Sequence, residues 1–191
     1  RGMVWNGAVG ETKSQMENAL QMNALSSDEI NDYYKLMQTT LPAIDHATKL
    51  NIANSIWYSE GFVVKPDFQK INADYFNATS SGLDFASPNA LNVINGWAKE
   101  KTNGLIPKVL DEISPDARMI LMNAIYFKGS WVQKFDVKNT READFFNEDG
   151  TVNKVNMMNQ QHDFSYSEDE TAQYLDLPYG NKAFSMTVVL P

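Results

Sequence analysis

The 191-residue sequence contains no cysteine, which excludes disulfides, thiolate catalysis and cysteine-ligated metal sites. It has only two histidines, His46 and His162, and neither belongs to a G-x-S-x-G nucleophile motif or an H-E-x-x-H metal motif. No apolar run approaches the roughly 20 residues that a membrane-spanning helix needs. We therefore predict no enzyme activity, no cofactor, no metal and no membrane span.

Positive charge is also scarce. The sequence has 16 Lys and Arg against 24 Asp and Glu, which gives a formal net charge of −8. Proteins that bind nucleic acid or anionic membranes present basic patches. The charge balance therefore argues against both kinds of partner.

Helical signals concentrate in the first half of the chain. A T-x-x-Q pattern at Thr12 and an S-x-x-E pattern at Ser26 are capping boxes, which predict two helix starts. Two further helices are predicted to open at Lys65-Pro66 and Ser87-Pro88, because proline is favoured in a first helical turn. The last of these carries apolar residues at helical spacing up to Trp97.

Strand signals dominate the second half. Residues 50–58 and 117–128 are rich in strand-forming residues, and a brief strand is predicted at 83–85. Further β segments are predicted around 145–146, 152–158, 174–179 and 183–190, the last two joined by a Gly180-Asn181 turn. Early helices followed by late strands indicate an α+β fold.

Two of the predicted strands carry an asparagine near the middle. Asn123 interrupts the apolar run from Met119 to Phe127, and Asn54 lies within residues 50–58. A strand this apolar is predicted to be buried on both faces. An unpaired amide there costs roughly 1–3 kcal/mol, so both side chains are expected to have partners.

Several motifs resemble one family in the same order. Residues 95–106 match N-x-W-x-x-x-x-T-x-G-x-I, and residues 123–131 read N-A-I-Y-F-K-G-S-W. Residues 155–158 match a V-P-M-M pattern with Asn156 in place of proline, and residues 175–179 match L-x-L-P-Y. With these motifs the chain resembles the serpin family along essentially its whole length.

The resemblance implies the serpin fold, in which helices pack on a large central sheet A accompanied by sheets B and C. Residues 1–191 are expected to form one partial serpin domain, cut at both ends, because the chain starts at Arg1 and stops within a hydrophobic run at Pro191. The reactive centre loop and the C-terminal remainder of the serpin are expected to lie outside these residues, in the same polypeptide or in a separate chain.

The resemblance also implies a mechanism. A serine protease, or in some cases a cysteine protease, cleaves the reactive loop, and the loop then inserts into sheet A and traps the enzyme. Such a protein is metastable, changes conformation on inhibition, and is expected to be a monomer that acts outside the cell or in the cell envelope. The alternative is a non-inhibitory serpin that acts as a carrier or a chaperone-like binding protein.

Five residues match positions that the family uses when sheet A opens. Asn54 and Asn123 correspond to the shutter at the centre of the sheet, Asn95 and Trp97 to helix F that covers it, and Trp131 to the breach where insertion begins. The usual partner of the shutter asparagine is a histidine on a fifth strand, which is absent here. Asn123 is therefore expected to lack a partner within this chain.

Overall fold

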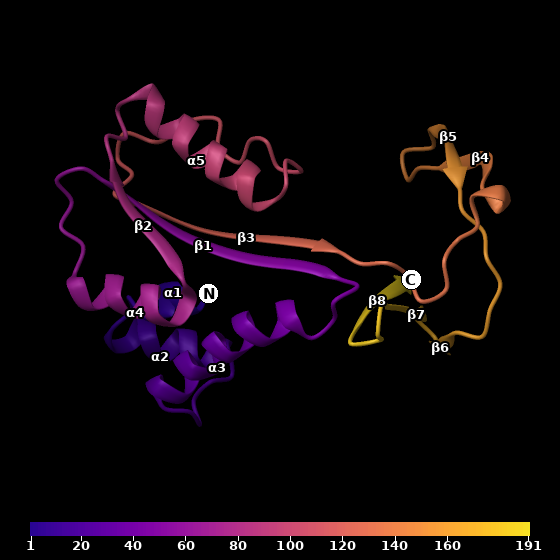
Figure 1. Cartoon of the computed structure of the whole chain (residues 1–191), viewed down its shortest axis with the longest axis horizontal. Helices are drawn as coiled ribbons and strands as arrows, with labels where there is room; N and C mark the ends of the chain where they lie inside the picture. The colour runs from indigo at the N-terminus through magenta and orange to yellow at the C-terminus, as the bar shows by residue number, and fades with distance from the viewer. The chain divides into compact units, whose positions relative to one another are not determined.

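The computed structural model describes residues 1–191, which form two compact units. The first comprises Arg1–Ile44 and Lys49–Phe127, and the second comprises Asp45–Thr48 and Lys128–Pro191. The helices of eight or more residues all lie in the first unit, and β-hairpins dominate the second (Figure 1). We describe each unit by itself, and the assignment of residues 1–191 to a single domain stays a prediction.

The first unit is a three-stranded sheet with helices on both faces. Its sheet has the order β2-β1-β3, with α5 on one side and α1 to α4 on the other (Figure 1). The elements, in chain order, are α1 (Gly2–Trp5), α2 (Gly10–Ala19), α3 (Ser27–Thr40), η1 (Leu41–Ala43), β1 (Lys49–Ser59), α4 (Pro66–Phe76), β2 (Ala78–Leu83), α5 (Pro88–Lys101) and β3 (Met119–Lys128).

Strand β1 lies in the middle of this sheet and pairs in opposite senses with its neighbours. It runs parallel to β2, in a register that sets Asn54 against Ala78. Against β3, the Ser59 amide donates to the Arg118 carbonyl, while Asn54 faces Asn123 further along, which is the order of an antiparallel pair. The polar residues at the centres of the two strands are thereby placed side by side.

The two faces of β1 feed two hydrophobic clusters, as the period of two along a strand requires. Trp57 points to the α5 side and packs with Ile94, Trp97 and Ala124. Ile56 points to the opposite side and packs with Met3 and Phe76. The sheet is therefore covered on both faces near its centre.

Most helix predictions are confirmed, with one correction. The Ser26 capping box is present, with Ser26 and Glu29 bonding to each other's backbone amides. The box predicted at Thr12 is wrong, because α2 already begins at Gly10 after the extended residue Val9 and has no side-chain cap. Gln15 instead donates to Glu11 one turn earlier.

Two strand predictions also need correction. β3 is not buried on both faces: it lies at the edge of the three-stranded sheet, and Ile125 is 59% exposed. The strand predicted at 83–85 occupies Ala78–Leu83 instead, because residues 84–87 form a turn in which Asp84 accepts from the Ala86 amide.

The second unit is entirely β apart from the short 3₁₀ helix η2 (Val137–Asn139). An antiparallel pair is made by β4 (Arg141–Phe146) and β5 (Val152–Met157), and an antiparallel sheet has the order β6-β7-β8. These last three strands are β6 (Ser165–Glu168), β7 (Gln173–Tyr179) and β8 (Phe184–Leu190). β6 was not predicted, because all four of its residues are exposed and it carries no apolar alternation.

The turn between β7 and β8 forms at Gly180-Asn181 as predicted. Gly180 has φ of +45°, and an added Cβ atom would collide with the carboxylate of Asp45. That carboxylate is only 3% exposed and accepts hydrogen bonds from the Thr48 hydroxyl and the Ala47 and Asn181 amides. Glycine is therefore required at this position both by conformation and by space.

Candidate functional site

The two strand asparagines are in direct contact. Asn123 Nδ2 donates to Asn54 Oδ1 at 2.9 Å, and also lies 3.4 Å from the Ala53 carbonyl oxygen. Asn54 is 6% exposed, whereas Asn123 is exposed at the sheet edge. The expectation that Asn123 has no partner within this chain is wrong, because the neighbouring strand supplies the acceptor.

The contact continues through Asn54 into the helical layer. Asn54 Nδ2 donates to Gln38 Oε1 and to the Phe76 carbonyl, both at 2.7 Å. Gln38 Nε2 in turn donates to the Tyr75 carbonyl at 2.9 Å. A chain of three side-chain amides therefore runs from β3 through β1 to α3 and also bonds the C-terminal end of α4.

Of the three hydrogen-bonded amides, Gln38 is the one that sequence reasoning missed. A usable signal exists, because Ile30, Tyr34 and Gln38 follow one another at intervals of four residues on the same helical stripe. Ile30 is 2% exposed, so this stripe faces the core. A glutamine in such a stripe predicts a polar partner inside, although not which one.

A cavity of about 240 Å³ lies beside the amides and is lined in part by Tyr34, Gln38, Asn54, Phe76 and Asn123. Burial is the main cause that raises the pKa of the Tyr34 hydroxyl, so this group stays protonated at neutral pH. The cavity is lined by amides, apolar side chains and a neutral phenol at this end. Such a set can hold strands together by hydrogen bonds.

Asn95, predicted to belong to the covering helix, bonds to the segment that follows the helix. Its Nδ2 donates to the Leu110 carbonyl at 2.9 Å, and its Oδ1 accepts from the amides of Val109 and Leu110 at 2.8 and 3.0 Å. All three bonds join α5 to residues 109–110. None of them reaches the sheet.

Trp97 is one of the α5 residues that pack against the sheet. It is 8% exposed and packs edge-on against Trp57 of β1, with ring centroids 6.3 Å apart. The indole N–H groups of both residues are buried, and neither has a hydrogen-bond partner. A buried donor without a partner costs roughly 1–3 kcal/mol, so this contact is held by packing and is weakened by its polar atoms.

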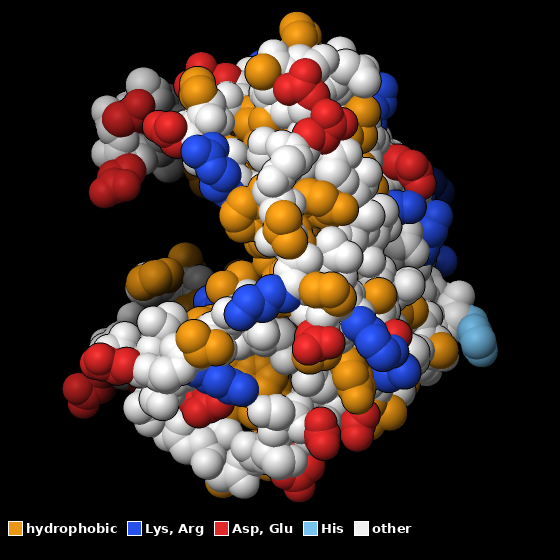
Figure 2. Space-filling view, turned by 90° about the vertical axis from the view of Figure 1, so that its left-hand side faces the viewer, with side chains coloured by type: hydrophobic (Ala, Val, Ile, Leu, Met, Phe, Trp, Pro, Cys, Tyr) orange, Lys and Arg blue, Asp and Glu red, His pale blue; other side chains and the backbone are white.

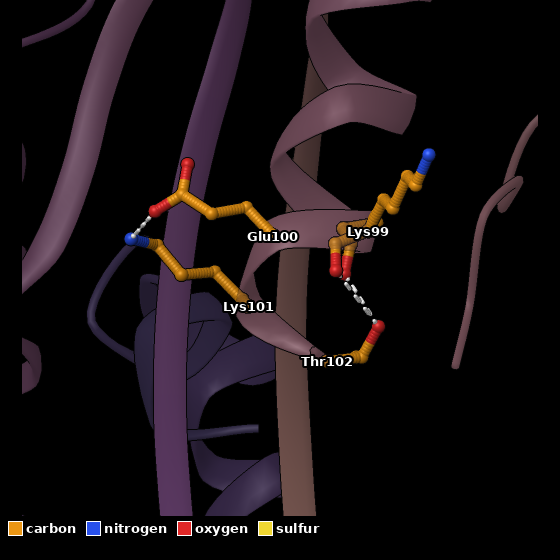
Figure 3. A network of polar contacts seen from close by, with 5 residues as sticks. Lys99, Glu100, Lys101 and Thr102 are labelled. Atoms are coloured by element: carbon orange, nitrogen blue, oxygen red, sulfur yellow. Dashed lines mark hydrogen bonds and ion pairs between the residues drawn. The ribbon is translucent and has the colours of Figure 1, made fainter. Parts of the chain in front are cut away.

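The C-terminal end of α5 is closed by Thr102, which is 2% exposed. Its hydroxyl donates to the Ala98 carbonyl at 2.7 Å and accepts from the Ile106 amide at 3.0 Å. Figure 3 shows this end of the helix. Glu100 and Lys101 form an ion pair there, with 2.7 Å between Oε1 and Nζ, and Thr102 takes no part in it. The threonine thus ties the helix to residues beyond it, as Asn95 does.

Trp131, the predicted breach residue, lies in the second unit. Its ring stacks on Tyr179 with centroids 4.2 Å apart and planes 17° apart, and Phe135 lies edge-on at 6.4 Å. Backbone bonds from Val132 to Pro178 and from Gly180 to Ser130 fix the segment against the end of β7. The structure brings Asn54 and Asn123 into contact, and Trp131 is placed only within its own unit.

The two histidines of the chain, His46 and His162, are both exposed. His162 lines a cavity of about 630 Å³ with Lys134 and Arg141, and no serine, threonine or tyrosine lines that cavity. On the face drawn in Figure 2, hydrophobic side chains reach the surface among interspersed acidic and basic ones. No helix is long and apolar enough to cross a bilayer.

Comparison with known proteins identifies the fold. The family model described as Serpin (serine protease inhibitor) matches residues 2–191. An uncharacterized serpin-like protein of Methanosarcina acetivorans is 35% identical in an alignment of 193 positions, which covers 98% of this chain and 45% of that protein. The leukocyte elastase inhibitor of Bos taurus is 33% identical, covering 99% of this chain and 51% of that protein.

Solved structures agree. The thermophilic serpin tengpin in its native state superposes on this chain with a TM-score of 0.88 at 36% identity, covering 100% of this chain and 48% of tengpin. Its latent state gives a TM-score of 0.87. The chain therefore spans about half the length of the relatives it matches, and its mixed helix and sheet structure is an incomplete serpin fold. On these matches the chain belongs to the serpin family, whose members are described as serine protease inhibitors.

Proposed function

We propose that this chain is the sheet-opening half of a serpin that inhibits serine proteases by suicide-substrate trapping. A protease cleaves a reactive loop that lies outside residues 1–191, and the loop then inserts beside β3. The chain's own part in this reaction is to hold the sheet closed until cleavage and to let it widen afterwards. Asn54 and Asn123 act as the shutter in this proposal.

The observation that carries the proposal is the free edge of β3, a strand whose centre is held to β1 by a polar side-chain contact. β3 exposes Ile125 and Asn123, and between Asn123 and β1 the side-chain bonds are those to Asn54 and Ala53. One hydrogen bond contributes a net stabilisation of about 0.5–1.5 kcal/mol. A newly paired strand forms several backbone hydrogen bonds and therefore contributes more than this one contact. Interlocked apolar side chains at the same place resist separation more strongly.

The covering helix supports the same reading. α5 meets the sheet through Trp97 and its apolar neighbours, and its hydrogen-bonded side chains point to its own C-terminal extension instead. A cover held by packing alone can shift without first breaking specific bonds. In this proposal Asn95 holds α5 to the segment that follows it, and Trp97 holds α5 against the sheet by packing.

The partners follow from the proposed reaction. The target is a serine protease, with a cysteine protease as the less common case, and the rest of the serpin supplies the reactive loop. A monomeric state and an extracellular or cell-envelope location stay predictions, since the relatives include a protein from an archaeon and one from cattle. The breach role of Trp131 also stays a prediction.

The proposal is tested by mixing the intact protein with trypsin, chymotrypsin and elastase and separating the products in SDS. Inhibition by trapping produces a covalent complex that survives SDS with at least one enzyme. Enzyme whose catalytic serine has been blocked beforehand is the control and must give no complex. Cleavage by every enzyme of the panel without a complex contradicts the proposal and favours the non-inhibitory carrier.

A further inference from the structure

The chain contains three Asn-Gly pairs, at Asn6, Asn95 and Asn103. This dipeptide is chemically labile because glycine has no side chain to shield its backbone nitrogen. That nitrogen can attack the side-chain carbonyl carbon of the preceding asparagine. The three asparagine side chains differ in how firmly hydrogen bonds hold them, so the three pairs are expected to react at different rates.

Two of the three asparagine side chains are held in place. Asn95 makes three hydrogen bonds to residues 109–110, and its glycine lies inside α5. Asn6 donates to the Gly2 carbonyl at 3.1 Å and exchanges two hydrogen bonds with Asn31, which is 4% exposed. In both cases the carbonyl carbon cannot turn toward the next backbone nitrogen while these bonds persist.

Asn103 is not held in this way. It is exposed, its side chain makes no hydrogen bond in the structure, and it sits in the left-handed region at φ of 51° just beyond the last residue of α5. Gly104 follows with φ of +84° and open space around its Cα atom. We propose that Asn103 is the spontaneous deamidation site of this protein, converted ahead of Asn6 and Asn95.

The turn around Asn103 sets the rate. The Gly104 amide donates to the Lys99 carbonyl at 2.7 Å, so this bond must open before the nitrogen can attack. Thr102 closes the same turn from the other side, because its hydroxyl accepts from the Ile106 amide at 3.0 Å. Thr102 is therefore a positioning residue that slows the modification by keeping the turn closed. Figure 3 shows the bond from its hydroxyl back to α5.

The reaction balances with water as the only co-reactant. The Gly104 nitrogen loses its proton and bonds to Cγ of Asn103, and the side-chain nitrogen leaves as ammonia, which gives a cyclic succinimide. Water then opens the ring at one of its two carbonyls and yields aspartate or isoaspartate. The product adds a negative charge at the C-terminal end of α5, where the helix dipole is already negative.

The test is incubation of the intact protein in mildly alkaline buffer containing ¹⁸O-labelled water, followed by peptide mapping. Asn103 is expected to incorporate label at least about tenfold faster than Asn95. Thr102→Val removes the hydroxyl and is expected to speed labelling at Asn103 by about tenfold, whereas Thr102→Ser retains it and stays near the original rate. Thr79→Val, on an exposed threonine of β2, is the matched control and changes nothing.

Three outcomes overturn the proposal. These are conversion of Asn6 or Asn95 at or before the rate of Asn103, no conversion of Asn103 under conditions in which the denatured chain reacts, and equal rates in Thr102→Val and Thr102→Ser. Circular dichroism verifies that each variant is folded, and the Val and Ser variants are compared with each other if both are less stable. Independently, Asn103→Asp is expected to lower Tm by about 1–3 °C relative to Asn103→Gly, which keeps the left-handed backbone without the charge.

Discussion

Asn123 and Asn54 meet side chain to side chain across the two strands, with the edge strand donating and the central strand accepting at 2.9 Å. The acceptor residue is buried, and its own amide is already engaged by α3 and α4. Asn54 therefore anchors Asn123 from the β1 side. This contact fixes the centre of β3, whose other edge is free to pair with a further strand.

Replacing Asn123 with alanine removes the donor and leaves the buried oxygen of Asn54 without its partner. We expect the free energy of unfolding to fall by about 1 kcal/mol and the protein to insert its loop or polymerise more readily. Thermal unfolding and native gels of the intact protein measure both effects. Asn153→Ala, at an exposed asparagine of β5, is the matched control, and an unchanged Tm without polymers in Asn123→Ala disproves the role.

Gln38 and Asn123 are predicted to be energetically coupled although they do not touch, because each bonds to Asn54. Gln38→Ala removes one acceptor of the Asn54 amide and the donor to the Tyr75 carbonyl. In a double-mutant cycle with Asn123→Ala we expect a coupling of at least about 0.5 kcal/mol. Pairing Gln38→Ala with Asn153→Ala should give additive effects. Additivity in both cycles would show that the amide chain is not a unit.

Ser55 offers a stabilising substitution. Its hydroxyl is fully buried and has no hydrogen-bond partner, so alanine removes a desolvated polar group at almost the same shape. We expect Ser55→Ala to raise the free energy of unfolding by about 1 kcal/mol. Ser26→Ala, which removes the cap of α3, should lower it by about 1 kcal/mol. Urea unfolding distinguishes the two, and a loss of stability in Ser55→Ala contradicts the prediction.

The turn between β6 and β7 is predicted to weaken in acid. Hydrogen bonds from the Thr171 hydroxyl and amide, the Ala172 amide and the Tyr174 hydroxyl lower the pKa of Asp169 from 3.8 to about 2. Because the folded pKa lies below the unfolded one, the stabilisation is complete above 3.8 and disappears as the pH falls toward about 2. Amide exchange of Thr171 and Ala172 reports it.

Asp169→Asn is the control for this acid transition. It keeps the side-chain size and one acceptor oxygen but cannot titrate, so protection of the turn amides should be lower at neutral pH and flat toward acid. A variant that still loses protection over the same range would show that another group is responsible.

Features that depend on neighbouring residues were predictable from the sequence. The start of α3 follows from Ser26 and Glu29, which bond to each other three residues apart, and the β7–β8 turn follows from Gly180. The wrong start of α2 shows the limit of this reasoning, since the helix was free to begin two residues before Thr12 without any side-chain cap.

Features that depend on the order of strands were not predictable in this way. Whether β3 is central or at an edge is decided by its partners, and its apolar residues read the same in either place. Asn123 bonds to Asn54, which lies 69 residues away in the sequence on β1. Asn54 bonds to Gln38, which lies 16 residues away on α3. The family resemblance predicted that both asparagines lie at the sheet centre. That Gln38 bonds to Asn54 could be seen only in the three-dimensional structure.

The bonding of α5 has a mechanical consequence. Asn95 and Thr102 fasten the helix to residues 106–110, while its contact with the sheet consists of apolar surfaces and two indole N–H groups without acceptors. The helix and residues 106–110 thus form a unit that is rigid internally and is attached to the sheet by packing. If the strands of the sheet move apart, this unit can shift and dock again without unfolding, because none of its internal hydrogen bonds has to break.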